Sequence, residues 1–385
     1  MTWHKEHRSD DGVMRLVVDS HAVRHVEQTW PEFGRDPRHL RFGLASDGVS
    51  PYGVKSLSHS TWPVVLTNYN VPPWLASKKG FLLLSLFRDL RKSRTSTFIS
   101  SLWLRNFSNY GLEWMMSMMV VRNELDGIGH IPIERARLKR WSILHRLPYW
   151  KDLLIQHLLD PMHIEANVTK SLIKRIFGEK DGKPARRACE EFGVHPEAWI
   201  QVSDGGIESL PSAPWILTTE ERKICRQRIS DIRFPTSFGS CLREAFEKDG
   251  AKWHAALKSH DYHILLQYVL PIVLQGLGSQ DLRDAIYDLS ALMRWVCSKT
   301  VRTTDIDEKE LFAITTLCKL ERTLPPDYFD SQIHVLVHLV REVSLLWTSS
   351  RQMDDLARTY VVEEDHSGSI LYETSCVRRS FNPKP

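Results

Sequence analysis

The helical periodicity of residues 217–346 constrains the fold of this chain more than any other feature of its sequence. Apolar residues recur there every three or four positions through several successive segments, as they do on the buried faces of packed helices. The first segment opens with Thr-x-x-Glu, in which Thr218 can cap a helix and Glu221 can reach back to its first amide. We therefore predict an α-helical domain over residues 217–346. Its inner faces are predicted to contain Leu265, Leu266, Val269, Leu292, Leu317, Val335 and Leu339.

Residues 40–87 have a different pattern, in which short apolar runs alternate with turn residues. This pattern is typical of β-strands joined by loops, so the chain as a whole is predicted to be α/β with a large helical region at its C-terminal side. The polar opening, residues 1–39, lacks sustained periodicity and is predicted to be an extended lead-in with a short helix around residues 20–29. The other predicted divisions are a disrupted basic and Met-rich segment at about 88–140, a linker at 179–216 and an irregular tail at 347–385.

The composition is that of a foldable protein, with 42% hydrophobic residues and a formal net charge of +4. This mild positive charge is compatible with a polyanionic partner but does not require one. The six cysteines form no Cys-x-x-Cys pair, so neither a zinc knuckle nor a disulfide framework is indicated, and a reducing compartment is expected. No apolar stretch approaches the length of a membrane span, and no N-terminal targeting segment is apparent, so no membrane partner is expected.

Two acidic residues stand where a strand and a helix are expected to meet loops. Asp47 follows the apolar run LRFGLAS and precedes Gly48, a position from which a strand end can project a carboxylate. An Asp-Gly pair after a strand is also an ordinary turn signal. Asp160 closes the apolar run DLLIQHLLD and precedes the helical pattern of MHIEANV, where it could be a simple helix N-cap. Taken singly, both acids have a structural as well as a functional interpretation.

Longer motifs add a family resemblance. RFGLASDGVSPYG, WPVVLTNYNVPPWL, LPYWKDLLIQHLLDPMHIEANV, KSHDYHILLQYVLPI and the stretch from LCKLERTLPPDYFD through HVLVHLVRE follow one another along the chain. In this order they resemble the transposases of plant En/Spm-type (CACTA) DNA transposons, together with the helical domain that commonly follows in such elements. The resemblance covers well over half of the chain, and several long motifs in one order are more specific than any short pattern.

The resemblance implies a DDE/D-type transposase with an RNase H-like catalytic core over residues 40–178. Such an enzyme cleaves and rejoins phosphodiesters at transposon ends, and its carboxylates hold two divalent ions, Mg²⁺ or Mn²⁺. The first family acid corresponds to Asp47 and the second to Asp160, so these two are the expected catalytic residues and metal ligands. The family's Asp-x-x-His pattern adds His163, which could orient the carboxylate or contact a phosphate. DNA is the implied partner and the nucleus the implied location, with self-association left open.

The neighbouring polar residues have simpler interpretations beside the functional ones. His163 could equally be a capping or packing histidine, and Glu165 is predicted to face solvent rather than metal. Lys258, His260 and His263 match family positions, with a DNA contact as the functional alternative, but we predict that they form a helix N-terminus with Asp261 as its local cap.

The chain also departs from the family in two places. It has no Pro-aromatic-Glu-Arg segment after HLVRE, so the third metal-binding acid is unassigned, and whether the chain is an enzyme depends on that acid. The segment in which the family has a Cys-x-x-Cys element is short and basic here. We therefore predict a shortened, inactive copy, with a non-catalytic or domesticated DNA- or protein-binding module as the alternative. Contacts with DNA phosphates are predicted at Arg135, Arg137, Lys139 and Arg140, whose simpler interpretation is a solvated flank.

Overall fold

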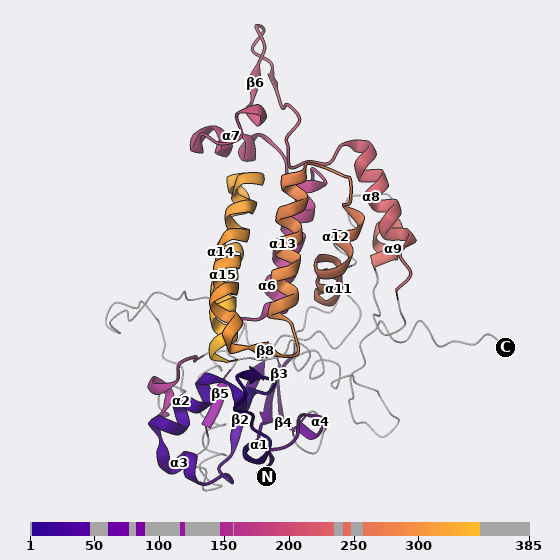
Figure 1. Ribbon diagram of the computed structural model, residues 1–385. Coiled ribbons are helices and arrows are strands. Elements are labelled where there is room, and N and C mark those ends of the chain that lie inside the picture. The colour runs from indigo at the N-terminus through magenta and orange to yellow at the C-terminus, as the bar shows by residue number, and fades with distance from the viewer. Residues whose placement is uncertain are drawn as a thin grey trace, which may run out of the picture. The chain divides into compact units, whose positions relative to one another are not determined.

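The computed structural model describes residues 2–46, 61–76, 82–88, 116–119, 147–156, 158–234, 242–247 and 257–346 (Figure 1). The chain divides into two compact units, whose main parts are Met1–Leu159 and Asp160–Val343. None of the helices within the described ranges is both long enough and apolar enough to span a membrane.

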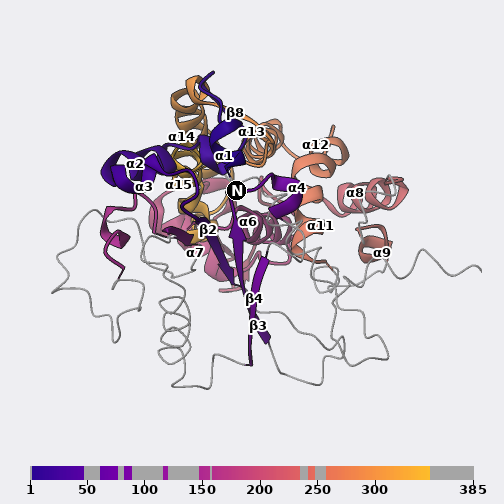
Figure 2. The same cartoon turned by 90° about the horizontal axis from the view of Figure 1, so that it is seen from below.

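A four-stranded sheet forms the centre of the first unit. Strands β2 (Arg41–Ser46), β3 (Thr61–Asn68) and β4 (Leu82–Arg88) are successive antiparallel neighbours, and they coincide with the apolar runs that predicted strands (Figure 2). The short strand β5 (Met116–Met119) pairs in parallel with the other edge of β2. The strand order is therefore β4-β3-β2-β5, with β2 in the interior of the sheet.

Short elements surround this sheet in the first unit. They are α1 (Trp3–Glu6), β1 (Val13–Met14), η1 (Val17–Asp19), α2 (His21–Thr29), α3 (Pro31–Arg35), α4 (Pro73–Ala76) and η5 (Trp150–Asp152). The helix predicted around residues 20–29 is α2, and the Ser20 hydroxyl accepts a hydrogen bond from the Val23 amide at its start. The opening segment is more folded than its polar composition predicts, because tertiary contacts rather than periodicity hold it. Glu27 on α2, for example, pairs with both Arg8 and Arg41, at 2.5 and 2.7 Å.

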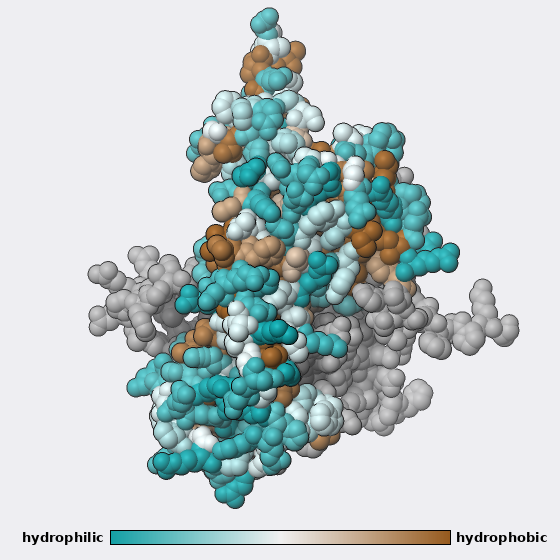
Figure 3. All heavy atoms as spheres, viewed as in Figure 1, coloured by the Kyte–Doolittle hydropathy of each residue, from teal (hydrophilic) through white to brown (hydrophobic). Residues whose placement is uncertain are grey.

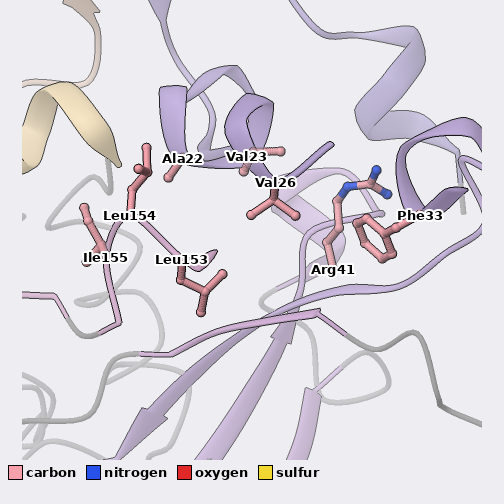
Figure 4. Close-up of a pocket in the computed structure, with 8 residues that line it drawn as sticks. All are labelled: Ala22, Val23, Val26, Phe33, Arg41, Leu153, Leu154 and Ile155. Atoms are coloured by element: carbon pink, nitrogen blue, oxygen red, sulfur yellow. The ribbon is translucent and has the colours of Figure 1, made fainter. Parts of the chain in front are cut away.

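A small cavity of about 20 Å³ lies beside α2 in this unit (Figure 4). It is lined by Ala22, Val23, Val26, Phe33, Arg41, Leu153, Leu154 and Ile155. The guanidinium carbon of Arg41 lies 4.7 Å from the centre of the Phe33 ring, within the range of a cation–π contact. This cavity has room for about one water molecule, so it indicates imperfect packing rather than a ligand site.

The second unit is helical, as the periodicity predicts. Its main helices are α6 (Pro161–Ile176), α7 (Lys183–Phe192), α8 (Thr219–Asp231), α9 (Leu242–Glu247), α11 (Ser259–Ile264), α12 (Leu270–Val273), α13 (Gln280–Val296), α14 (Ile306–Thr323) and α15 (Ser331–Leu345). Its shorter elements are η6 (Pro196–Ala198), β6 (Gln201–Val202), β7 (Glu208–Ser209), the π-helical turn η8 (Leu265–Val269), β8 (Val301–Arg302), η9 (Thr303–Asp305) and η10 (Pro326–Tyr328). Helices α13 and α14 lie side by side, and α6 packs against α11.

The residues predicted to line this core are mostly where they were expected. Leu265, Leu266, Val269, Leu292 and Leu339 are fully buried, whereas Leu317 and Val335 are partly buried. The predicted capping box is also present, since the Thr218 hydroxyl accepts from the Glu221 amide and the Thr218 amide donates to the Glu221 carboxylate. Helical periodicity thus located both the helices and most of their inner faces.

Buried arginines fasten the helices of this unit to their loops. Arg175 on α6 donates to the backbone oxygen of Asp327 and to the hydroxyl of Ser171, and its guanidinium lies over the Tyr328 ring. Arg186 on α7 donates to Asp181 and to the backbone oxygen of Ala198. Each planar guanidinium satisfies several acceptors at once in a fixed fork geometry that a lysine ammonium does not have.

Residues 179–216, predicted to be a linker, contain α7 and a hairpin of β6 and β7. The hairpin projects beyond α7 in Figure 1, and hydrophobic side chains are visible on it in Figure 3. Val202 and Ile207 are 64% and 72% exposed. We refer to residues 192–210 as the apolar arm.

Candidate functional site

The first predicted acid lies just beyond a described strand. Strand β2 ends at Ser46, and Asp47 itself lies outside the described residues, as do Arg135, Arg137, Lys139 and Arg140. An interior strand therefore leads directly into Asp47, as the strand pattern predicts. The approach of Asp47 to Asp160 stays a prediction.

Asp160 is the N-cap of α6. Its Oδ1 accepts a hydrogen bond of 3.0 Å from the backbone amide of His163, and Pro161 occupies the first helical position, where its missing N–H leaves no donor unsatisfied. Asp160 is thus observed as a helix N-cap, which is its structural interpretation. One turn after His163, the Asn167 side chain donates to Gln332 on α15 at 3.3 Å.

Glu165 is fully buried, so the prediction that it faces solvent is wrong. Its Oε2 lies 2.7 Å from Nδ1 of His263 and accepts from the Gln267 amide at 3.3 Å, while its Oε1 has no hydrogen-bond partner within the described residues. Burial raises the pKa of this carboxyl, and the neighbouring His263 opposes the shift. The periodicity of α6 could not reveal this contact, because the partners lie about a hundred positions further along the chain.

His263 belongs to α11, whose start agrees with the prediction. The Asp261 carboxylate accepts from the backbone amide of Lys258 at 2.9 Å, so Asp261 does act as a local cap. The same helix turns His263 inward, with 16% of its side chain exposed, and brings its ring against Glu165.

Gln267 lies on the π-helical turn η8, which the sequence explains. Pro271 has no amide hydrogen, and its ring would clash with the carbonyl four residues earlier in a regular helix. The Leu270 amide consequently bonds to Leu265, five residues earlier, and the carbonyl of Leu266 has no amide to accept from in that pattern. The hydroxyl oxygen of Ser290 on α13 lies 2.8 Å from that carbonyl and 2.8 Å from the carbonyl of Ile286, so its proton can supply the missing donor. The π turn directs the buried Gln267 amide to both Glu165 and the backbone oxygen of Met293.

Cys297 completes a group of three potential metal ligands. It directly follows α13, and its sulfur, a ring nitrogen of His263 and a carboxylate oxygen of Glu165 all lie within 4.8 Å of one another. Across the described residues no other group of three is found, and Asp160 does not belong to this one. Gln267 and Cys297 were both missed from the sequence. The spacing of four residues between His263 and Gln267 was the available signal, because it places them on one helix face.

Two known families match parts of this chain. Residues 11–94 match the model of transposase family tnp2, and residues 296–363 match a domain of unknown function, DUF4218. Part of the chain is thus similar to a transposase family. The first match spans β2, β3 and β4 and includes Asp47, whereas Asp160, Glu165 and His263 lie between the two matched segments. A search of curated proteins finds no match to this chain.

Proposed function

We propose that this chain is a CACTA (En/Spm)-type transposase that still binds DNA and has lost strand cleavage. The main support is the tnp2 match, which covers the interior strand β2 and the acid that follows it, Asp47. A transposase of this kind acts on transposon ends in the nucleus, so DNA is the proposed partner and the nucleus the proposed location.

The sheet of the first unit supports an RNase H-like origin. Such a core begins with an antiparallel meander of three strands, and a parallel strand then joins the free edge of the first. Strands β2, β3, β4 and β5 have this arrangement. The first acid of such a core belongs to the first strand of the meander, which agrees with the position of Asp47 after β2.

Loss of cleavage is inferred from the acids available. Two-metal cleavage requires several carboxylates held around Mg²⁺ or Mn²⁺ ions roughly 4 Å apart, which activate the attacking oxygen and stabilise the leaving one. Asp47 and Asp160 are the ligands that the family pattern provides, with His163 beside them, but Asp160 serves as a helix cap. With the third acid also unassigned in the sequence, these residues do not make up a complete site.

DNA binding needs less than cleavage does. Phosphate contacts require only exposed lysines and arginines, and each one contributes to an affinity that falls as salt rises. The formal net charge of +4 and the basic residues Arg135, Arg137, Lys139 and Arg140 support such binding. We expect it to be largely independent of DNA sequence.

The test is a strand-cleavage and strand-joining assay on DNA duplexes with CACTA terminal repeats, in Mg²⁺ or Mn²⁺. We expect no cleavage above that of an Asp47→Ala variant, and binding that weakens steeply between low and physiological salt. Robust cleavage that the Asp47→Ala variant abolishes would contradict the loss of activity. Salt-insensitive binding, or none, would contradict DNA as the retained partner.

A second candidate function is a protein-binding module, which the apolar arm favours. Phe192, Val202 and Ile207 are each more than 60% exposed, and large exposed apolar side chains gathered on one feature are typical of binding surfaces. A Val202→Ser/Ile207→Ser variant separates the candidates. If the function rests on phosphate contacts, this variant should bind DNA like the wild type. If the function rests on the apolar arm, the variant should lose its protein partner in a pull-down.

A further inference from the structure

We propose that Glu165, His263 and Cys297 bind one Zn²⁺ ion inside the helical unit. The three residues come from α6, from α11 and from the position after α13, and their ligand atoms gather within 4.8 Å. The proposed site lies wholly within the unit Asp160–Val343 and requires neither Asp47 nor DNA.

The chemistry of the three donors selects the metal. A thiolate, an imidazole and a carboxylate together suit Zn²⁺, whereas Mg²⁺ prefers oxygen ligands only. The site is therefore distinct in kind from the paired carboxylates that transposition chemistry requires. Three protein ligands leave a fourth tetrahedral position for a water molecule.

The spacing of the donors is close to what a tetrahedral ion needs. Zinc–ligand distances of about 2.0 to 2.3 Å place two ligands of one ion roughly 3.3 to 3.7 Å apart. A ring nitrogen of His263 and a carboxylate oxygen of Glu165 lie within 4.8 Å of each other, so they would have to approach by no more than about 1.5 Å. The sulfur of Cys297 lies within the same distance of both ligand atoms and would have to approach them by a similar amount.

The surroundings of Glu165 favour an ion over a purely structural contact. Its Oε1 is buried with no hydrogen-bond partner anywhere in the described chain, and leaving a carboxylate oxygen so is costly. Ligation would satisfy it. The Gln267 amide holds the other oxygen, as the polar groups behind metal ligands commonly do. His263 and Cys297 are both partly exposed, which leaves a path for the ion to enter.

Cobalt substitution of the full-length chain tests the site. All proteins should have the His334→Ala/His338→Ala background, because those two rings on α15 face each other with their Nε2 atoms 3.1 Å apart and could bind metal by themselves. We expect one Co²⁺ per chain and a thiolate-to-cobalt charge-transfer band. Cys297→Ser should abolish the band and weaken Zn²⁺ binding at least about tenfold, whereas Cys318→Ser on α14 should change neither. A band that survives Cys297→Ser, or a chain that binds no ion, would overturn the proposal.

Alkylation gives a second measurement that needs no variant at the site. Zn²⁺ should slow the reaction of Cys297 with iodoacetamide, measured by peptide mass mapping, because a metal-bound thiolate is shielded. The exposed Cys318 in the same sample is the internal reference, and its rate should not change. Equal rates at Cys297 with Zn²⁺ and with a chelator would refute the site even if the variants fail to fold.

Discussion

The carboxylate of Asp160 accepts a hydrogen bond of 3.0 Å from the backbone amide of His163. The two residues of the family's Asp-x-x-His pattern are therefore joined through the backbone of the first helical turn. A catalytic pattern and a capping pattern have the same spacing here, because the amide three residues after an N-cap is the one that its side chain reaches.

Substitutions at Asp160 separate these two roles. Asp160→Ala removes the cap and should lower the free energy of unfolding by about 1 kcal/mol, whereas Asp160→Asn keeps an acceptor and should cost only a few tenths. Chemical unfolding followed by circular dichroism measures both. If Asn proves as costly as Ala, the charge rather than the cap matters at this position, and a metal or phosphate role for Asp160 regains support.

Removing the Ser290 hydroxyl should leave the Leu266 carbonyl without a donor. Because that carbonyl is buried beside Pro271, Ser290→Ala should lower the free energy of unfolding by about 1 to 3 kcal/mol. Ser298→Ala is the matched control. Its hydroxyl makes a comparable bond to Thr300 at an exposed site, so its loss should cost within about 0.5 kcal/mol. Equal stabilities of the two variants would show that water can replace the serine.

His4 should make the first unit sensitive to mild acid. Burial, and then the positive charge of Arg41, lower the pKa of this ring from 6.5 to about 4, with Glu27 opposing and Arg8 assisting the shift. The unfolded chain binds a proton between those values and the folded one does not, so stability should fall as the pH drops from 6.5 toward 4. Burial opposes the shift at Glu27, but Arg8 and Arg41 lower the pKa of its carboxyl. Its contribution to the free energy of unfolding is therefore lost only below pH 4.5.

The measurement is the urea midpoint across that pH range. His4→Gln should flatten the dependence above pH 4.5, and His21→Gln, on the exposed start of α2, should not. An unchanged slope in His4→Gln would assign the acid sensitivity to another group.

Arg175 should not tolerate lysine. Its guanidinium reaches Ser171, Asp327 and the face of Tyr328 together, and an ammonium group cannot maintain that set, so Arg175→Lys should cost on the order of 2 kcal/mol. Arg187→Lys, at an exposed ion pair with Glu208, should change stability by less than about 0.5 kcal/mol. Thermal unfolding compares them. Equal melting temperatures would mean that charge alone fastens α6 to η10.

Local patterns predicted much of this fold. The strands β2 to β4 and the long helices follow from apolar spacing, and the caps at Thr218 and Asp160 depend on residues within one helical turn. Apart from α2, which the sequence predicted, the short elements of residues 2–39 had no comparable signal, because contacts such as the ion pair of Arg8 with Glu27 stabilise them and not a repeating apolar face.

The candidate site was harder to predict, since it depends on long-range packing. Glu165 has the chemistry of a surface residue, and only the approach of His263 and Gln267 makes its burial tolerable. Cys297 looked isolated because no second cysteine is near it in sequence. Its neighbours are a histidine and a glutamate from two other helices.

The π turn also determines the rotation of His263 about the helix axis. Each residue of an α-helix turns the chain by about 100°, so the extra residue between Leu265 and Val269 sets the direction of α11 relative to α12. Because Pro271 would still exclude a regular helix, deleting one residue there would swing His263 by about that angle away from Glu165, while the side chains of the site remained chemically intact. The number of residues between His263 and Pro271 therefore determines whether His263 reaches Glu165, whatever those residues are.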